Sequence, residues 1–335
     1  MNNINTINRR QALAYGAAGF AGTSGLLSSA AAQTKGPPEL AKILVPFAIG
    51  GTLDLIARQL AQHLRGETAT TLIVENKSGA AGRIAVDALR QAPADGLTLA
   101  VHAGGIQSMY PHTYKQLSYD PFNDVVPVSL TNHLEFGLAV GPAVPDSVKN
   151  LHDYIAWIKV DPKRANIATP GAGTPLHFLA MLLGRAIGVD VNPVHYRGTG
   201  AALPELMGGQ VPALSTPLHD ALQQVVTGKV RILATSGTTR NRRSPQVATY
   251  AESGFPQLTS GDWYAVYVSG KTPPALQAQL SAQVRKALAA PALVATFNTL
   301  FIEPAGSTPA EAMKLARADY EHWGRIVKAV GYTPE

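Results

Sequence analysis

The sequence predicts an α/β protein with two doubly wound lobes joined by two crossover strands. Short β-rich runs alternate with helical patterns, as expected of open, mostly parallel sheets with helices on both faces. Residues 126–141 are strand-like throughout and leave no room for a helix, and residues 262–269 form a second extended segment. The length of 335 residues suits two domains of ordinary size. We therefore expect lobe 1 at residues 38–137 plus 262–335, and lobe 2 at residues 138–261.

The individual elements follow from these patterns in chain order. We expect strands at residues 43–47, 71–75, 98–102, 126–130, 136–140, 167–169, 192–196, 213–216, 232–236 and 264–268. We expect helices at residues 53–64, 82–91, 147–159, 175–187, 200–208, 219–227, 274–289, 292–300 and 309–329.

Residues 1–32 are typical of an export signal and are not expected to belong to the fold. Arg9 and Arg10 precede a mildly apolar stretch, which ends in small residues of the Ala-x-Ala type. The adjacent arginines and the weak hydrophobicity favour the twin-arginine route, with cleavage near Ala32 and a periplasmic destination. A membrane anchor fits poorly, because the apolar centre is short and rich in glycine.

The composition of the chain excludes some classes of function. Loss of Arg9 and Arg10 lowers the formal charge from +6 to +4, and a charge this small does not favour nucleic acid. The chain has no cysteine, so its fold rests on burial without disulfides.

A glycine turn at Gly50-Gly51 joins the first strand to the first helix. Such a turn lets the backbone approach a ligand closely, and the first helical N–H groups then point at whatever binds there. The turn is a seat for a small anion, most plausibly a carboxylate. It could equally be a turn that starts a helix and binds nothing.

Three further turns repeat this arrangement, at residues 168–177, 194–200 and 102–105. In the first of them Thr174 is placed as the helix N-cap, with Pro175 at the first helical position. Two turns in each lobe would converge on one cleft at the carboxyl ends of the strands.

The chain resembles the periplasmic receptors of tripartite tricarboxylate transporters, the Bug-type solute-binding proteins. The first turn matches that family's Pro-Phe-x-x-Gly-Gly-x-x-Asp, from Pro46 to Asp54, and an Ala-Arg pair follows at 57–58. The other matching motifs lie, in order, at residues 74–82, 93–99, 119–121, 170–177, 196–198 and 206–211. Together they cover essentially the whole chain after the signal.

The resemblance implies a type II periplasmic binding fold that closes on a small carboxylate, which is held by backbone N–H groups and bound waters. It also implies transporter membrane subunits as partners, a monomer, no cofactor, no metal and no catalytic residue. The ligand-binding candidates carried over by motif position are Phe47, Gly51, Thr52, Gly104, Gly171, Gly173, Thr174, His177 and Tyr196.

Several of these residues have a purely structural alternative. Asp54 could simply favour the dipole of its helix, and Thr174 could act as a cap alone. His177 could bond a neighbouring loop, Tyr196 could belong to the core, and Trp263 could pin the crossover.

Departures from the family pattern bear on the identity of the ligand. Pro212 and Thr216 stand where the family commonly has acids, so if Thr216 faces the cleft, no carboxylate pairs with a ligand ammonium there. This disfavours amino-acid ligands. His102 replaces a small polar residue, and Arg83 replaces an asparagine, either as a solvated residue or as a charge facing a second ligand carboxylate. We add His102 and Thr216 to the candidates.

Three functions remain open at this point. The first is a solute receptor serving a transporter or a sensor, the second is an exported α/β enzyme, and the third is a scaffold with a vestigial cleft. The sequence contains no Gly-x-Ser-x-Gly and no His-Glu-x-x-His, which favours a protein that is not an enzyme.

Overall fold

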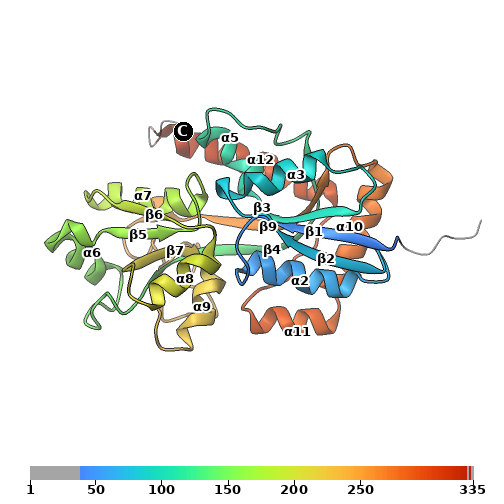
Figure 1. The fold of residues 1–335 in the computed structure, drawn as a ribbon. Coiled ribbons are helices and arrows are strands. Elements are labelled where there is room, and N and C mark those ends of the chain that lie inside the picture. The colour runs from blue at the N-terminus through green and yellow to red at the C-terminus, as the bar shows by residue number, and fades with distance from the viewer. Residues whose placement is uncertain (1–37, 330–331, 333–335) are drawn as a thin grey trace, which may run out of the picture. The chain divides into compact units, whose positions relative to one another are not determined.

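The computed structural model describes residues 38–329 and residue 332. The predicted export signal at residues 1–32 therefore lies outside the described residues and stays a prediction. The described residues belong to one compact unit of the chain (Figure 1). Among them, no helix is long and apolar enough to cross a membrane.

The strands match the predicted positions, with one difference. They are β1 (Leu40–Val45), β2 (Thr71–Asn76), β3 (Thr98–Ala103), β4 (Val125–Val140), β5 (Asn166–Thr169), β6 (Asn192–His195), β7 (Ala213–Pro217), β8 (Arg231–Thr235) and β9 (Gly261–Ser269). The two strands expected at 126–130 and 136–140 are one continuous strand, β4.

All nine predicted helices are present. The helices are α2 (Thr52–Leu64), α3 (Arg83–Gln91), α4 (Gly105–Ser108), α5 (Tyr110–Thr113), α6 (Leu151–Val160), α7 (Pro175–Ile187), α8 (Thr199–Met207), α9 (Leu218–Val225), α10 (Pro274–Leu288), α11 (Pro291–Thr299) and α12 (Pro309–Ala329). Three 3-10 helices add residues 80–82, 162–164 and 256–258. The single-turn helices α4 and α5 were not predicted, because four residues are too few to show a helical period.

Strand β4 belongs to two sheets. Its residues from Val125 to Glu135 pair with β9, and β9 continues through β3 and β1 to β2; we call this the first sheet. Its residues from Phe136 to Val140 pair with β7, and β7 continues through β5 to β6; with β8, which also pairs with β4, this is the second sheet. The chain thus passes from one sheet to the other between Glu135 and Phe136.

The expectation of mostly parallel sheets was wrong. Strands β1–β2, β1–β3, β5–β6 and β5–β7 pair in parallel, but every pair that includes β4 or β9 is antiparallel. The reason is that both crossover strands run against their neighbours. The α/β class itself is confirmed.

Helices cover both faces of the first sheet, with α3 and α12 above the strands and α2 and α11 below them in Figure 1. Helix α2 shows why the sequence folds this way. Its buried residues include Leu53, Ile56, Ala57, Leu60 and Leu64, whose spacing of three and four residues puts one apolar face against the sheet. This packing fixes the start of α2, and with it the first glycine turn.

Candidate functional site

A narrow cavity lies where the four predicted glycine turns meet. Its volume, taken as the space open to the centre of a water molecule, is about 50 Å³, enough for a few waters. It is lined by Phe47, Ala48, Gly51, Thr52, Leu53, Asp54, Ala103, Gly105, Tyr110, Leu134, Phe136, Pro170, Thr174, Pro175, Leu176, Thr199, Pro217, Asp220, Asp262 and Tyr264. The lining thus includes residues from all four turns and from both sheets.

The beginnings of four helices that are longer than a single turn face this cavity. Thr52 begins α2, Pro175 begins α7, Thr199 begins α8, and Pro217 is the N-cap of α9. Helix N-termini carry partial positive charge and free N–H groups, so they favour an anion. None of the lining residues is a lysine, an arginine or a histidine. An anion in this cavity would therefore be held by backbone dipoles.

Asp54 fixes the shape of the first turn. Its carboxylate accepts hydrogen bonds from the Gly50 backbone N–H at 3.1 Å, from Arg58 at 2.9 and 3.0 Å, and from Asn76 Nδ2 at 3.0 Å. Burial alone would raise the pKa of Asp54, but these bonds outweigh burial and lower the pKa below its usual value. Asn76 also donates to the Phe47 carbonyl at 3.0 Å. Asp54 thus does more than favour the helix dipole, because it ties together the turn that lines the cavity.

The second turn ends in the predicted cap. Thr174 is the N-cap of α7, where its hydroxyl accepts from the His177 N–H at 3.3 Å and donates to the Gly171 carbonyl at 2.8 Å. The Gly173 N–H donates to His177 Nδ1 at 3.0 Å. Gly173 also has φ +70°, a conformation that favours glycine. The Gly173 N–H is therefore already bonded within its own loop.

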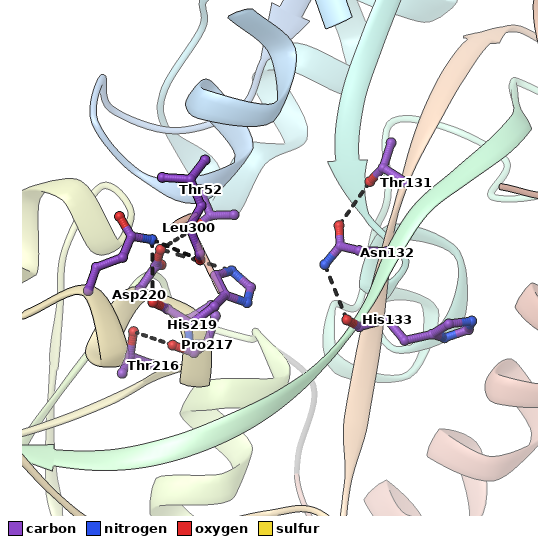
Figure 2. A network of polar contacts seen from close by, with 10 residues as sticks. Thr52, Thr131, Asn132, His133, Thr216, Pro217, His219, Asp220 and Leu300 are labelled. Atoms are coloured by element: carbon purple, nitrogen blue, oxygen red, sulfur yellow. Dashed lines mark hydrogen bonds and ion pairs between the residues drawn. The ribbon is translucent and has the colours of Figure 1, made fainter. Parts of the chain in front are cut away.

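Asp220 is a lining residue that the sequence analysis missed. It lies in the first turn of α9, is 4% exposed, and accepts a hydrogen bond from the Thr52 hydroxyl of α2 (Figure 2). This bond joins helix α9, which follows strand β7 of the second sheet, to helix α2, which follows strand β1 of the first sheet. The available signal was an acid at the third residue of a helix that follows a strand, the position that Asp54 has in α2.

Asp262 supplies a third carboxyl group to the lining. Burial raises its pKa to about 8, although a hydrogen bond from the Trp263 N–H at 2.8 Å acts in the opposite direction. The charge of Asp319 acts in the same direction as burial, whereas the Gly104 and Gly105 N–H groups oppose it together with that of Trp263.

Four of the eleven predicted site residues line the cavity: Phe47, Gly51, Thr52 and Thr174. The other seven, which the structure places outside the lining, are His102, Gly104, Gly171, Gly173, His177, Tyr196 and Thr216. His102 is buried beside Gly82, with Nε2 3.4 Å from the Gly82 carbonyl, and burial lowers its pKa to about 4. His177 is buried and bonded to its own loop.

The remaining predicted residues serve packing and local bonding. The Gly104 N–H donates to the Trp263 carbonyl at 2.8 Å, and the bare Gly104 Cα packs against the Trp263 ring. Gly171 lies against Ala81, and Tyr196 packs on the apolar cluster beneath α8 and α9. Thr216 is fully buried, with its hydroxyl 3.4 Å from the Pro217 carbonyl.

Two residues whose role the sequence left open also lie outside the lining. Trp263 donates from Nε1 to Asp319 at 2.7 Å, so it pins the crossover strand β9 to helix α12. The Arg83 guanidinium lies 3.8 Å from the centre of the Tyr114 ring and bonds the Ala80 carbonyl.

Two wider cavities, of about 400 and 550 Å³, lie beside the crossover and share His133, Leu134 and Glu135. Neither is lined by the glycine turns. Within residues 38–329, no group of three or more His, Asp or Glu side chains could hold a metal ion. The narrow cavity is therefore the candidate site.

Comparison with known proteins gives a consistent result. The family model described as the tripartite tricarboxylate transporter family receptor matches residues 56–332. Protein BugT of Bordetella pertussis is 29% identical over 318 residues, which are 93% of this chain and 95% of that protein.

Solved structures agree in fold. The periplasmic binding protein BugD is 27% identical with a TM-score of 0.83, covering 89% of this chain and all of its own. A protein of R. palustris, solved with adipate, is 26% identical with a TM-score of 0.83, covering 89% of this chain and 99% of its own.

Proposed function

Since this chain belongs to the tripartite tricarboxylate transporter receptor family, we propose that it binds a small carboxylate in the cavity formed by its four glycine turns. Membership confirms the resemblance predicted from the motifs, and the two-lobed fold of periplasmic binding proteins is confirmed with it. Members of the family are periplasmic solute receptors.

One observation carries the choice of ligand: four helix N-termini meet at one cavity whose lining has no cationic side chain. Backbone N–H groups and helix dipoles hold an anion without a buried arginine. The adipate in the R. palustris structure supports a carboxylate as the anion.

We propose that binding involves closure of two lobes, residues 38–137 with 262–335 and residues 138–261. The bond between Thr52 and Asp220 joins the two sides of the cavity, and the cavity has room for only a few waters. An organic acid is larger than this space, so the two sides must separate to admit it. A ligand drives closure only if it binds the closed form better than the open form.

The finer assignments are proposals that rest on the sequence. The chain is exported by the twin-arginine route, works as a monomer without a cofactor, and passes its ligand to transporter membrane subunits. Binding is reversible and changes no covalent bond, so the protein is not an enzyme. The seven candidates outside the lining are proposed to shape the loops around the ligand.

Thermal unfolding with a panel of small organic acids tests the proposal. Carboxylates should raise the melting temperature, while the corresponding amides should not, because only the acids carry the charge that the helix N-termini favour. Gly51→Val places a branched side chain in the lining and should abolish the shift. Ala143→Val, at an exposed position, is the matched control and should keep it.

If no acid shifts the melting temperature, and Gly51→Val behaves like the natural protein, the proposal is wrong. The protein would then be better described as a scaffold with a vestigial cleft. Conversion of an acid to a product during incubation, followed by mass spectrometry, would instead indicate an enzyme.

A further inference from the structure

Tyr114 joins the two proposed lobes without lining the cavity. It follows helix α5 in lobe 1, and its hydroxyl donates to the Ala172 carbonyl in lobe 2 at 2.6 Å. The neighbouring Thr113 hydroxyl donates to the Gly173 carbonyl at 3.4 Å. Tyr114 is 9% exposed and is not among the lining residues. The two bonds therefore reach the second glycine turn, residues 168–177, from outside the cavity.

Arg83 holds the Tyr114 ring in position for this bond. The Arg83 guanidinium carbon lies 3.8 Å from the ring centre, within the range of a cation–π contact. Its Nε donates to the Ala80 carbonyl at 3.0 Å, so the guanidinium is fixed as well. From lobe 2, Gly173 leaves room for the ring, because a Cβ at Gly173 would lie 2.5 Å from the Tyr114 hydroxyl oxygen. The ring thus fits against an arginine of one lobe and a bare glycine of the other.

The turn that precedes Arg83 is strained. Residues 79–82 all have positive φ, and the two alanines among them, at +47° and +54°, adopt a left-handed conformation that a Cβ disfavours. Such a conformation persists only where the surroundings hold it. Here the Tyr110 hydroxyl donates to the Ala81 carbonyl at 2.7 Å, and a Cβ on Gly171 of lobe 2 would lie 3.3 Å from the Ala81 Cβ. The strained turn is therefore a shaped surface on which lobe 2 rests.

Separation of the lobes would break the contacts between Tyr114 and lobe 2. The Tyr114 hydroxyl and the Ala172 carbonyl would then bond to water, so their mutual bond stabilises the closed form relative to the open form. The bond between Thr52 and Asp220 also joins the two sides, but both of its residues line the cavity, where a ligand would touch them. Tyr114 acts on closure alone.

We infer that Tyr114 is a positioning residue of the closed form: a latch, held by Arg83, that slows release of the bound acid without touching it. This inference rests on the proposed binding with lobe closure and names the residues that keep the lobes together. Because the latch does not contact the ligand, it should slow the release of every acid by the same factor.

Tyr114→Phe tests the latch, because it keeps the ring and removes the hydroxyl. Dissociation rates can be measured by stopped-flow tryptophan fluorescence for the acids of the thermal panel, with succinate, adipate and benzoate among them. The rates should rise by roughly three- to tenfold, the effect of one hydrogen bond, and by the same factor for each acid that binds. Without ligand, the melting temperature should stay close to that of the natural protein, because the latch is open in that state.

Tyr119→Phe is the matched control. The Tyr119 hydroxyl donates to the Ile106 carbonyl at 2.8 Å, and both residues lie in lobe 1. This variant loses the same kind of bond within one lobe, so its melting temperature should fall while its dissociation rates stay unchanged. Arg83→Gln removes the cation from the Tyr114 ring and should raise the rates by a smaller factor. Combined with Tyr114→Phe, it should add little, since the two side chains act as one unit.

The possible outcomes separate the latch from the binding site. If acids bind but Tyr114→Phe releases them at the natural rate, the inference is wrong and the carboxylate site stands. A lower melting temperature with unchanged rates, as in Tyr119→Phe, would make the Tyr114 bond an ordinary structural contact. A factor that differs between acids would place Tyr114 against the ligand and also overturn the latch. If no acid of the panel binds the natural protein, the proposed carboxylate site is wrong, and the inference fails with it.

Discussion

At the scale of single residues, Asp54 shows how one carboxylate holds a backbone turn in place. The sequence left open whether Asp54 only favours the dipole of α2. The structure shows bonds to it from Gly50, Arg58 and Asn76, three groups that the chain brings together from two strand ends and a helix.

Asp54→Asn should lower the free energy of unfolding by roughly 1–3 kcal/mol at pH 7, because the charge-assisted hydrogen bonds to the buried Asp54 carboxylate are lost. The loss stays within this range because Arg58 is half exposed, so water can solvate its freed guanidinium. The folded pKa of Asp54 is lowered, so its contribution is present above its unfolded pKa and is lost as the pH falls through the folded pKa. Urea unfolding from pH 7 to pH 3 should therefore show the two proteins converging at acid pH. A difference that persists unchanged at pH 3 would show that shape, not charge, is responsible.

Single residues also show most clearly what could not be predicted from the sequence. Glycine turns could be located from local pattern alone, and the cavity does form where they meet. Which N–H groups are free could not be predicted, since that of Gly173 is taken by the ring of His177. Asp220 was missed because its partner, Thr52, lies 168 residues away in the chain.

At the scale of elements, helix starts and strands followed from the sequence because their signals are local. Thr174 and Pro175 marked the first residue of α7 correctly. Strand direction could not be predicted from these local signals, because the antiparallel pairing of β4 and β9 depends on which strands they meet in the fold.

Thr174→Ala should destabilise the protein by about 1 kcal/mol, since the His177 N–H loses its capping acceptor. The melting temperature should fall by about 2–4 °C, measured by circular dichroism. Thr174→Ser keeps the hydroxyl and should remain close to the natural protein. A Ser variant as unstable as the Ala variant would assign the effect to the lost methyl group.

At the scale of the whole described unit, two turns from opposite sides of the cavity touch. The Ala48 N–H donates to the Arg197 carbonyl at 3.1 Å, and a Cβ placed on Gly200 would lie 2.7 Å from the Ile49 carbonyl oxygen. Gly200 lies in the first turn of α8, where alanine is otherwise well suited. An added methyl group at Gly200 therefore opposes only the contact between the two turns.

Gly200→Ala should weaken ligand binding by roughly 10–100-fold with little change in melting temperature, because it disfavours the closed form and not the fold. Small-angle X-ray scattering in the presence of ligand should show a larger radius of gyration than for the natural protein. Ala143→Val, at an exposed position outside the lining, should compact normally. Equal compaction of both variants would argue against closure at this contact.

The shared strand β4 has a consequence for how this molecule could be divided. One uninterrupted strand supplies the backbone partners of β9 up to residue 135 and those of β7 after it. A cut at residue 135 would therefore leave an exposed, unpaired strand edge on each fragment. Neither fragment should be soluble when produced alone. The proposed closure of the two lobes would therefore take place in a protein that is synthesised and unfolded as one.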